Sequence, residues 1–136
     1  KSGYIKRLWA ERKMHLLDTS TIINLMYGSE KGKVIQKIVG KDSVAISTLT
    51  VYELWIGMKP SEKDFFSNLI QEVTVIDFNK LSAIKSAEVE KELKKSGTMI
   101  NKVDILIAGT CLAHGLELVT CDADFDKVKA LIVHQC

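Results

Sequence analysis

The chain has 136 residues, of which 46% are hydrophobic and 26% charged, with a formal net charge of +2. This length allows one compact domain with a hydrophobic core and leaves no room for two. No apolar run approaches the roughly 18 residues of a membrane span, so we expect a cytoplasmic protein without membrane contact. The three cysteines lack C-x-x-C spacing, which indicates neither a disulfide framework nor a zinc site, and we expect reduced thiols.

The charge is unevenly distributed along the chain. Residues 1–13 hold five basic side chains and one acidic one, whereas residues 14–136 hold 14 basic and 16 acidic groups, a net of −2. Both arginines lie in the first segment, so phosphate contacts made by the rest of the chain must come from lysines. Met14 offers a natural start. We therefore expect residues 1–13 to be a leader or an appended segment and residues 14–136 to form a single domain.

From residue 14 onward, strand-like and helix-like segments alternate. Short apolar runs predict strands at residues 13–17, 43–47, 73–78, 116–120 and 131–134. Helical spacing connects them at residues 19–27, 33–39, around 52–55, 61–71, 80–95 and from Asn101 to a stop at Gly115, and a helical turn is expected at 124–129. Alternation of this kind indicates right-handed crossovers and an α/β fold with a parallel sheet covered on both faces.

Acidic side chains occur where these predicted strands end. Asp18, Glu53, and Asp122 or Asp124 each follow a strand, and Asp104 lies in the first turn of the helix that precedes the fourth strand. Because the carboxyl ends of parallel strands share one edge of a sheet, we expect these acids to lie close together.

Each acid also has a local explanation as a helix cap. Asp18 could cap the helix after it, Thr50-x-x-Glu53 matches a capping box, Asp104 stands three residues after Asn101, and Asp122 or Asp124 could cap the last turn. The joint placement favours more than capping, because carboxylates at one edge repel unless some are protonated or a cation lies among them.

The chemistry of the acid set predicts which cation it would bind. An all-oxygen set without clustered His or Cys favours Mg²⁺ or Mn²⁺ over zinc or copper. The three histidines, His15, His114 and His134, are scattered in the sequence, and we interpret them as packing or surface residues.

Four motifs carry a family resemblance that spans residues 14 to 134: LLDTSTIINL, TLTVYELWIG, VDILIAGTCLAHGLELVT and CDADF. In this order and spacing they resemble a PIN domain, most like the VapC toxins of prokaryotic toxin–antitoxin pairs. The resemblance implies a five-stranded parallel sheet in a three-layer α/β/α sandwich. It also implies a pocket that binds Mg²⁺ or Mn²⁺ and cuts RNA, a homodimer, and a small antitoxin protein as partner.

By position, the family's four main acids fall on Asp18, Glu53, Asp104 and Asp122. The resemblance makes Asp18, Asp104 and Asp122 metal ligands, with Glu53 and Asp124 completing the shell directly or through water. It makes Thr19 and Thr120 supporting hydroxyl neighbours, and Asp124 a second, more variable acid.

The chemistry agrees with a metal-dependent endoribonuclease. A phosphodiester is anionic and water is a poor nucleophile, so a site without a positioned His or Lys needs metal ions. One alternative is a magnesium-dependent phosphatase or phosphotransfer receiver domain with Asp18 as nucleophile, although such a phosphatase would have a second aspartate where Ser20 stands. The other is a non-catalytic binding module whose acids only cap helices.

Overall fold

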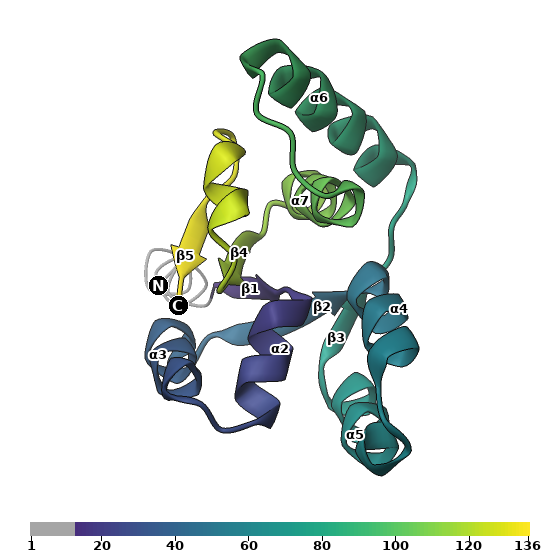
Figure 1. Ribbon diagram of the computed structural model, residues 1–136, viewed down its shortest axis with the longest axis vertical. Coiled ribbons are helices and arrows are strands. Elements are labelled where there is room, and N and C mark those ends of the chain that lie inside the picture. The colour runs from purple at the N-terminus through teal and green to yellow at the C-terminus, as the bar shows by residue number, and fades with distance from the viewer. Residues whose placement is uncertain (1–12) are drawn as a thin grey trace, which may run out of the picture.

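A computed structural model describes residues 13–136 of the chain (Figure 1). The predicted leader, apart from Lys13, lies outside the described residues, so the boundary at residue 13 stays a prediction. None of the described helices is long and apolar enough to cross a membrane.

Five parallel strands form one sheet in the order β3-β2-β1-β4-β5. The strands are β1 (Met14–Leu17), β2 (Ser43–Ser47), β3 (Thr74–Ile76), β4 (Glu117–Thr120) and β5 (Val133–Gln135). This confirms the predicted five-stranded α/β fold. The order also differs from the 2-1-3-4-5 order of receiver domains, which argues against the receiver alternative.

Helices connect the strands nearly where the sequence predicts them. They are α2 (Thr19–Met26), α3 (Glu30–Val39), α4 (Thr48–Gly57), α5 (Lys63–Glu72), α6 (Lys80–Ser96) and α7 (Lys102–His114), with short 3-10 turns η1 (Pro60–Glu62) and η2 (Ala123–Lys127). Asp18, Ser47, Asn79 and Asn101 cap α2, α4, α6 and α7 through their side chains, and Gly97 and Gly115 end α6 and α7 in the left-handed conformation.

The sheet lies between two layers of helices, which gives the predicted three-layer sandwich (Figure 1). Alternate strand residues point to opposite faces. Leu16 and Leu118 pack into the core beneath α6, α7 and η2. Leu17 and Val119 pack into the core on the other face, with side chains from α2 to α5.

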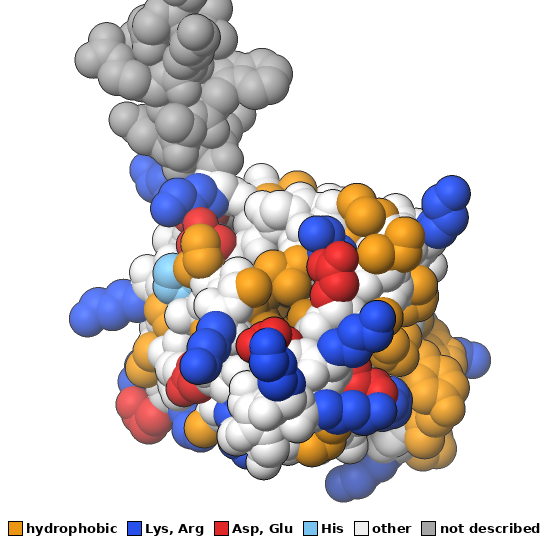
Figure 2. Space-filling view, turned by 90° about the horizontal axis from the view of Figure 1, so that it is seen from above, with side chains coloured by type: hydrophobic (Ala, Val, Ile, Leu, Met, Phe, Trp, Pro, Cys, Tyr) orange, Lys and Arg blue, Asp and Glu red, His pale blue; other side chains and the backbone are white. Residues whose placement is uncertain are grey.

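The outer surface of the α6 layer carries no single sign of charge. Figure 2 looks onto this side of the molecule, where lysines and acids intermingle. Ion pairs such as Lys85–Glu88 and Lys94–Glu90, at 3.5 and 3.3 Å, connect them. Lys102, close to Asp104 in the sequence, also forms an ion pair with Glu90. The ammonium group of Lys102 therefore contacts α6.

Helices α6 and α7 approach each other very closely at Gly109. A Cβ built there would lie 1.9 Å from Ser86 Oγ and 2.6 Å from the Ser86 backbone nitrogen. Only glycine leaves room for this approach. The contact therefore fixes the position of α7, which carries Asp104 in its first turn.

The expectation of reduced thiols is wrong for two of the three cysteines. Cys121 and Cys136 form a disulfide, whereas Cys111 is free and buried. Each paired cysteine directly follows a strand, Cys121 after β4 and Cys136 after β5. Because these strands are parallel neighbours, the sheet brings together two residues whose sequence spacing gives no sign of pairing.

Candidate active site

The predicted acids converge at the carboxyl edge of the sheet. Asp18 follows β1 and Asp122 lies two residues beyond β4, while Glu53 comes from the second turn of α4 and Asp104 from the first turn of α7. Strands β1 and β4 are direct neighbours, which sets Asp18 and Asp122 side by side in the sheet's order.

The pKa of Asp104 shows how strongly the acids of this pocket repel one another. Its pKa is raised to about 7, first by burial and then by repulsion from Asp122, Glu53, Asp18 and Asp124. All four other predicted acids therefore lie near enough to act on Asp104. A carboxylate surrounded by four others is costly to ionise unless a cation is present.

Asp18 is the most deeply placed of the acids, with 4% of its surface exposed. Its Oδ1 accepts hydrogen bonds from the Ser20 hydroxyl at 2.9 Å and the Thr21 backbone N–H at 3.0 Å, and the Thr21 hydroxyl lies 2.8 Å away. Its Oδ2 accepts one hydrogen bond, 2.6 Å long, from the Thr120 hydroxyl. Oδ2 therefore keeps more free acceptor capacity than Oδ1.

Thr19 orients the glutamate of the set. Its hydroxyl donates to Glu53 Oε1 at 2.6 Å, which joins the start of α2 to α4. Both predicted supporting threonines thus contact an acid, Thr19 contacting Glu53 and Thr120 contacting Asp18.

The two late aspartates lie in one tight turn. Asp122 caps η2, its Oδ1 accepting from the Asp124 backbone N–H at 2.9 Å, while the Asp122 N–H donates to Thr120 Oγ1 at 3.0 Å. Asp124 is paired instead with Lys127, 3.1 Å away. Of the two, Asp122 is linked through Thr120 to Asp18, and Asp124 lies closer to the rim.

Capping explains only part of the acid set. Asp18 and Asp122 do cap α2 and η2. The capping box predicted for Glu53 is not formed, because Ser47 caps α4 and accepts from the Thr50 N–H. Asn101 likewise caps α7 by accepting from the Val103 N–H. Glu53 and Asp104 thus reach the pocket without a capping task.

Sequence reasoning missed two hydroxyl residues, Ser20 and Thr21, that contact Asp18. The only signal was their position in the first turn after a capping aspartate. It also did not show that His15 and His134, interpreted as packing or surface residues, lie together, with ring centres 5.4 Å apart. Both side chains point to the same face of the sheet and meet across β4, which lies between β1 and β5.

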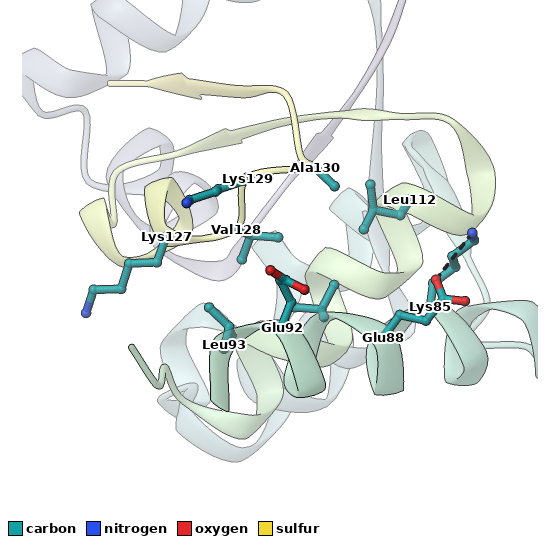
Figure 3. A pocket seen from close by; sticks show the side chains of 10 residues that line it. Lys85, Glu88, Glu92, Leu93, Leu112, Lys127, Val128, Lys129 and Ala130 are labelled. Atoms are coloured by element: carbon teal, nitrogen blue, oxygen red, sulfur yellow. Dashed lines mark ion pairs between the residues drawn. The ribbon is translucent and has the colours of Figure 1, made fainter. Parts of the chain in front are cut away.

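One sizeable cavity lies away from the acids. A pocket of about 360 Å³ separates α6 from the segment after η2, and Lys85, Glu88 and Glu92 of α6 face Leu112 and residues 127–130 across it (Figure 3). A smaller pocket of about 110 Å³ lies between α2 and α4. Its lining includes Thr19 and Glu53, so this second pocket opens beside the acid site.

Comparison with known proteins agrees with this fold. The PIN domain family model matches residues 15–131. The chain therefore belongs to the PIN-domain family.

Its relatives within that family are VapC proteins. Ribonuclease VapC1 of Rickettsia felis is 30% identical over 128 residues, which cover 87% of this chain and 92% of the relative. The tRNA(fMet)-specific endonuclease VapC of Salmonella typhimurium is 25% identical over 122 residues, covering 85% and 92%. The solved structure of VapBC-1 from nontypeable Haemophilus influenzae superposes with a TM-score of 0.77 at 26% identity, covering 90% of this chain and 97% of that one. The chain is thus a PIN domain of the VapC type.

Proposed function

We propose that the pocket formed by Asp18, Glu53, Asp104, Asp122 and Asp124 is the RNA-cleaving site of this VapC-type ribonuclease, the toxin of a toxin–antitoxin pair. One observation carries the proposal: the pKa of Asp104 is raised to about 7 by burial and by the other four acids. Carboxylates placed so that they repel one another are an arrangement that a bound cation would stabilise.

The donor set suits a hard divalent cation, Mg²⁺ or Mn²⁺. Asp18 Oδ2, Asp104 and Asp122 would be its ligands, and Glu53 and Asp124 would complete the shell directly or through water. Within residues 13–136, only one set of three possible ligands has its ligand atoms all within 4.8 Å of one another, and that set contains none of these acids. The carboxylates of the pocket are therefore spaced more widely than that. Water would fill part of the shell, as is usual for Mg²⁺.

When bound, such a cation would neutralise phosphate charge and acidify the attacking water. The side chains around it position the acids. Thr120 and Ser20 hold Asp18 in one rotamer, and Thr19 holds Glu53. Lys127, 3.1 Å from Asp124, places a positive charge at the rim, where an RNA phosphate would arrive.

The same pocket region supports a protein partner. The groove between α2 and α4 runs from Thr19 and Glu53 to the apolar side chains of Met26, Met58 and Phe66. Among the solved structures that resemble this chain, one is described as a member of the VapBC family of toxin–antitoxin systems and another as a toxin–antitoxin complex. We propose that a small antitoxin lays an apolar segment in this groove and offers an arginine or lysine to the acids.

We also propose that the chain forms a homodimer in the cytoplasm. Large apolar side chains are exposed on α2 and α4, namely Ile23, Tyr27, Tyr52, Trp55 and Ile56, the last with 67% of its surface accessible. A patch of this kind typically marks a protein contact.

The test is cleavage of structured RNAs with Mn²⁺ or Mg²⁺, with and without chelator. We expect cleavage by the wild type, none in chelator, and a loss of at least about a hundredfold in Asp104→Asn. Asp64→Asn, a matched change at an exposed acid on α5, should cleave normally. Metal-independent cleavage, or full activity in Asp104→Asn, would contradict the proposal.

A further inference from the structure

A second cluster of metal-binding side chains lies on the α2–α3 face of the sheet, away from the acid pocket. His15 of β1, Glu117 of β4 and His134 of β5 each offer one ligand atom, and these atoms all lie within 4.8 Å of one another. His15 stands opposite Glu117 in the strand register, and His134 stands opposite Val119, which shares a face with Glu117. Three adjacent strands thus supply the cluster.

His15 is arranged as a metal ligand would be. The residue is 3% exposed, and its Nε2 lies 2.9 Å from Asp42 Oδ2. Its other nitrogen, Nδ1, is buried and has no hydrogen-bond partner within residues 13–136. If Nε2–H donates to Asp42, the Nδ1 lone pair is free, and a carboxylate behind a histidine in this way is the usual support for metal ligation.

Glu117 and His134 complete the set. Glu117 Oε1 lies 2.7 Å from His134 Nε2, a contact that a proton now mediates and that a cation would replace with release of that proton. Glu117 Oε2 is 3.7 Å from the Lys13 ammonium, whose side chain is 57% exposed and free to move aside. The His134 side chain is 35% exposed, so an ion could enter from solvent and keep a water ligand.

We propose that His15, Glu117 and His134 bind one zinc ion, with Asp42 orienting His15. Two imidazoles and one carboxylate are a zinc donor set, and they differ in kind from the all-oxygen acid pocket. His15 precedes Asp18 by three residues, roughly 10 Å along β1, so the two sites are separate. The proposal does not depend on the nuclease function.

The ion would act structurally by fastening β5 to β1 across β4. Strand β5 has only three residues. Its Gln135 side chain donates to the Asp122 carbonyl oxygen at 3.0 Å, so a firmly held β5 also steadies the turn that carries Asp122.

The experiment is a titration of the oxidised protein with Co²⁺, followed by its visible absorption and by displacement with Zn²⁺, in the Asp104→Asn background to weaken binding at the acid pocket. We expect one equivalent of Co²⁺ with a tetrahedral-type spectrum that Zn²⁺ abolishes and excess Mg²⁺ does not. Asp42→Asn should weaken binding by about 10–100-fold, the usual effect of removing a supporting carboxylate. His134→Gln and Glu117→Gln should weaken it further.

His114→Gln is the matched control, because His114 is exposed on α7 and its Nδ1 lies 2.9 Å from the Thr110 carbonyl oxygen of the same helix, away from the cluster. It should bind Co²⁺ as the parent does. Zn²⁺ should also raise the melting temperature of the parent and of His114→Gln, but not of His134→Gln. Circular dichroism checks that His134→Gln is folded. Absence of the spectrum in the parent, or an unchanged spectrum and thermal shift in His134→Gln, would overturn the proposal.

Discussion

Asp104 differs from the other aspartates of the pocket in what surrounds its carboxylate. Asp18 and Asp122 each accept backbone or hydroxyl hydrogen bonds, which offset part of the cost of burying charge. Asp104 instead is partly buried and lies near four other acids, and burial and their repulsion raise its pKa to about 7. The cost of assembling the site is therefore concentrated at this residue.

That cost gives a stability prediction with a definite sign. Because the folded pKa lies above the ordinary value of 3.8, the folded state binds more protons between the two values, so this group increasingly destabilises the fold as pH rises from about 4 to 7. Asp104→Asn removes the charge. In chelator at pH 7 we expect the free energy of unfolding of Asp104→Asn to exceed that of the wild type by about 0.5–2 kcal/mol. This range is reduced because solvent screens the half-buried group.

Thermal or denaturant unfolding from pH 4 to 8 measures this difference. The advantage of the mutant should shrink toward pH 4, and the mutant should lose most of the stabilisation that Mn²⁺ gives the wild type. A mutant that is less stable than the wild type in chelator would show Asp104 to be a structural helix residue.

Thr120 contacts Asp18, the most deeply buried acid of the pocket, and substitutions of Thr120 test whether Asp18 needs this contact. Its hydroxyl donates to Asp18 Oδ2 and accepts from the Asp122 N–H. Thr120→Val keeps the shape and removes both contacts, so we expect RNA cleavage to fall by about 10–100-fold. Thr120→Ser keeps the hydroxyl and should retain most activity in the same assay. Equal rates for Thr120→Val and the wild type would show that Asp18 needs no such support.

The sequence identifies the acidic residues of the pocket but not all of the side chains that contact them. The acids are predictable because each lies after a strand or in the first two turns of a helix. Ser20 and Thr21 are not, because hydroxyls after a capping aspartate are common and only the folded turn aims them at Asp18. The meeting of His15 and His134 depends on strand order, which local patterns do not specify.

Among the elements, α7 is the one whose position matters most to the pocket. Its contact with α6 at Gly109 leaves no space for a methyl group. Gly109→Ala must push the helices apart, so we predict a loss of about 1–3 kcal/mol of stability, as for other overpacked cores. Cleavage should fall as well, because Asp104 moves with α7.

Gly57→Ala is the matched control. Gly57 is the last residue of α4, in the helix layer on the other face of the sheet, and a Cβ there meets nothing within 4 Å. We expect the stability of this variant to be unchanged or slightly increased, since alanine restricts the unfolded chain. A Gly109→Ala protein as stable and as active as Gly57→Ala would refute the close-packing argument.

Element positions are predictable to within a few residues, and the differences have local causes. Strand β2 has the predicted bounds, Ser43–Ser47. Helix α3 begins at Glu30, three residues earlier than expected, because its first two residues, Glu30 and Lys31, are charged and exposed and so show no hydrophobic period. Pro60 opens a separate 3-10 turn before α5, where the sequence predicts one continuous helix.

For the whole molecule, the apolar patch on α2 and α4 predicts self-association. Light scattering at micromolar concentration should give the mass of a dimer. Ile56→Glu, within the patch, should shift the mass toward the monomer, because burying an unpaired charge in an interface is unfavourable. Ile132→Glu changes an equally exposed isoleucine, 59% accessible, outside the patch and should remain dimeric. A monomeric wild type would contradict this prediction.

The disulfide between Cys121 and Cys136 turns the end of the described chain into a closed ring that contains η2 and β5. Of the five acids, this ring holds Asp122 and Asp124, while the other three lie outside it. Closing a loop with a sequence separation of 15 stabilises the fold by roughly 3 kcal/mol, because the unfolded chain loses entropy. Reducing conditions would open the ring and leave β5 held by its pairing with β4 alone. Amide hydrogen exchange at Val133 to Gln135 should then accelerate on adding a thiol reductant, while exchange in β1 stays slow. The redox state of its surroundings would thus set how long these two acids remain in place beside the other three.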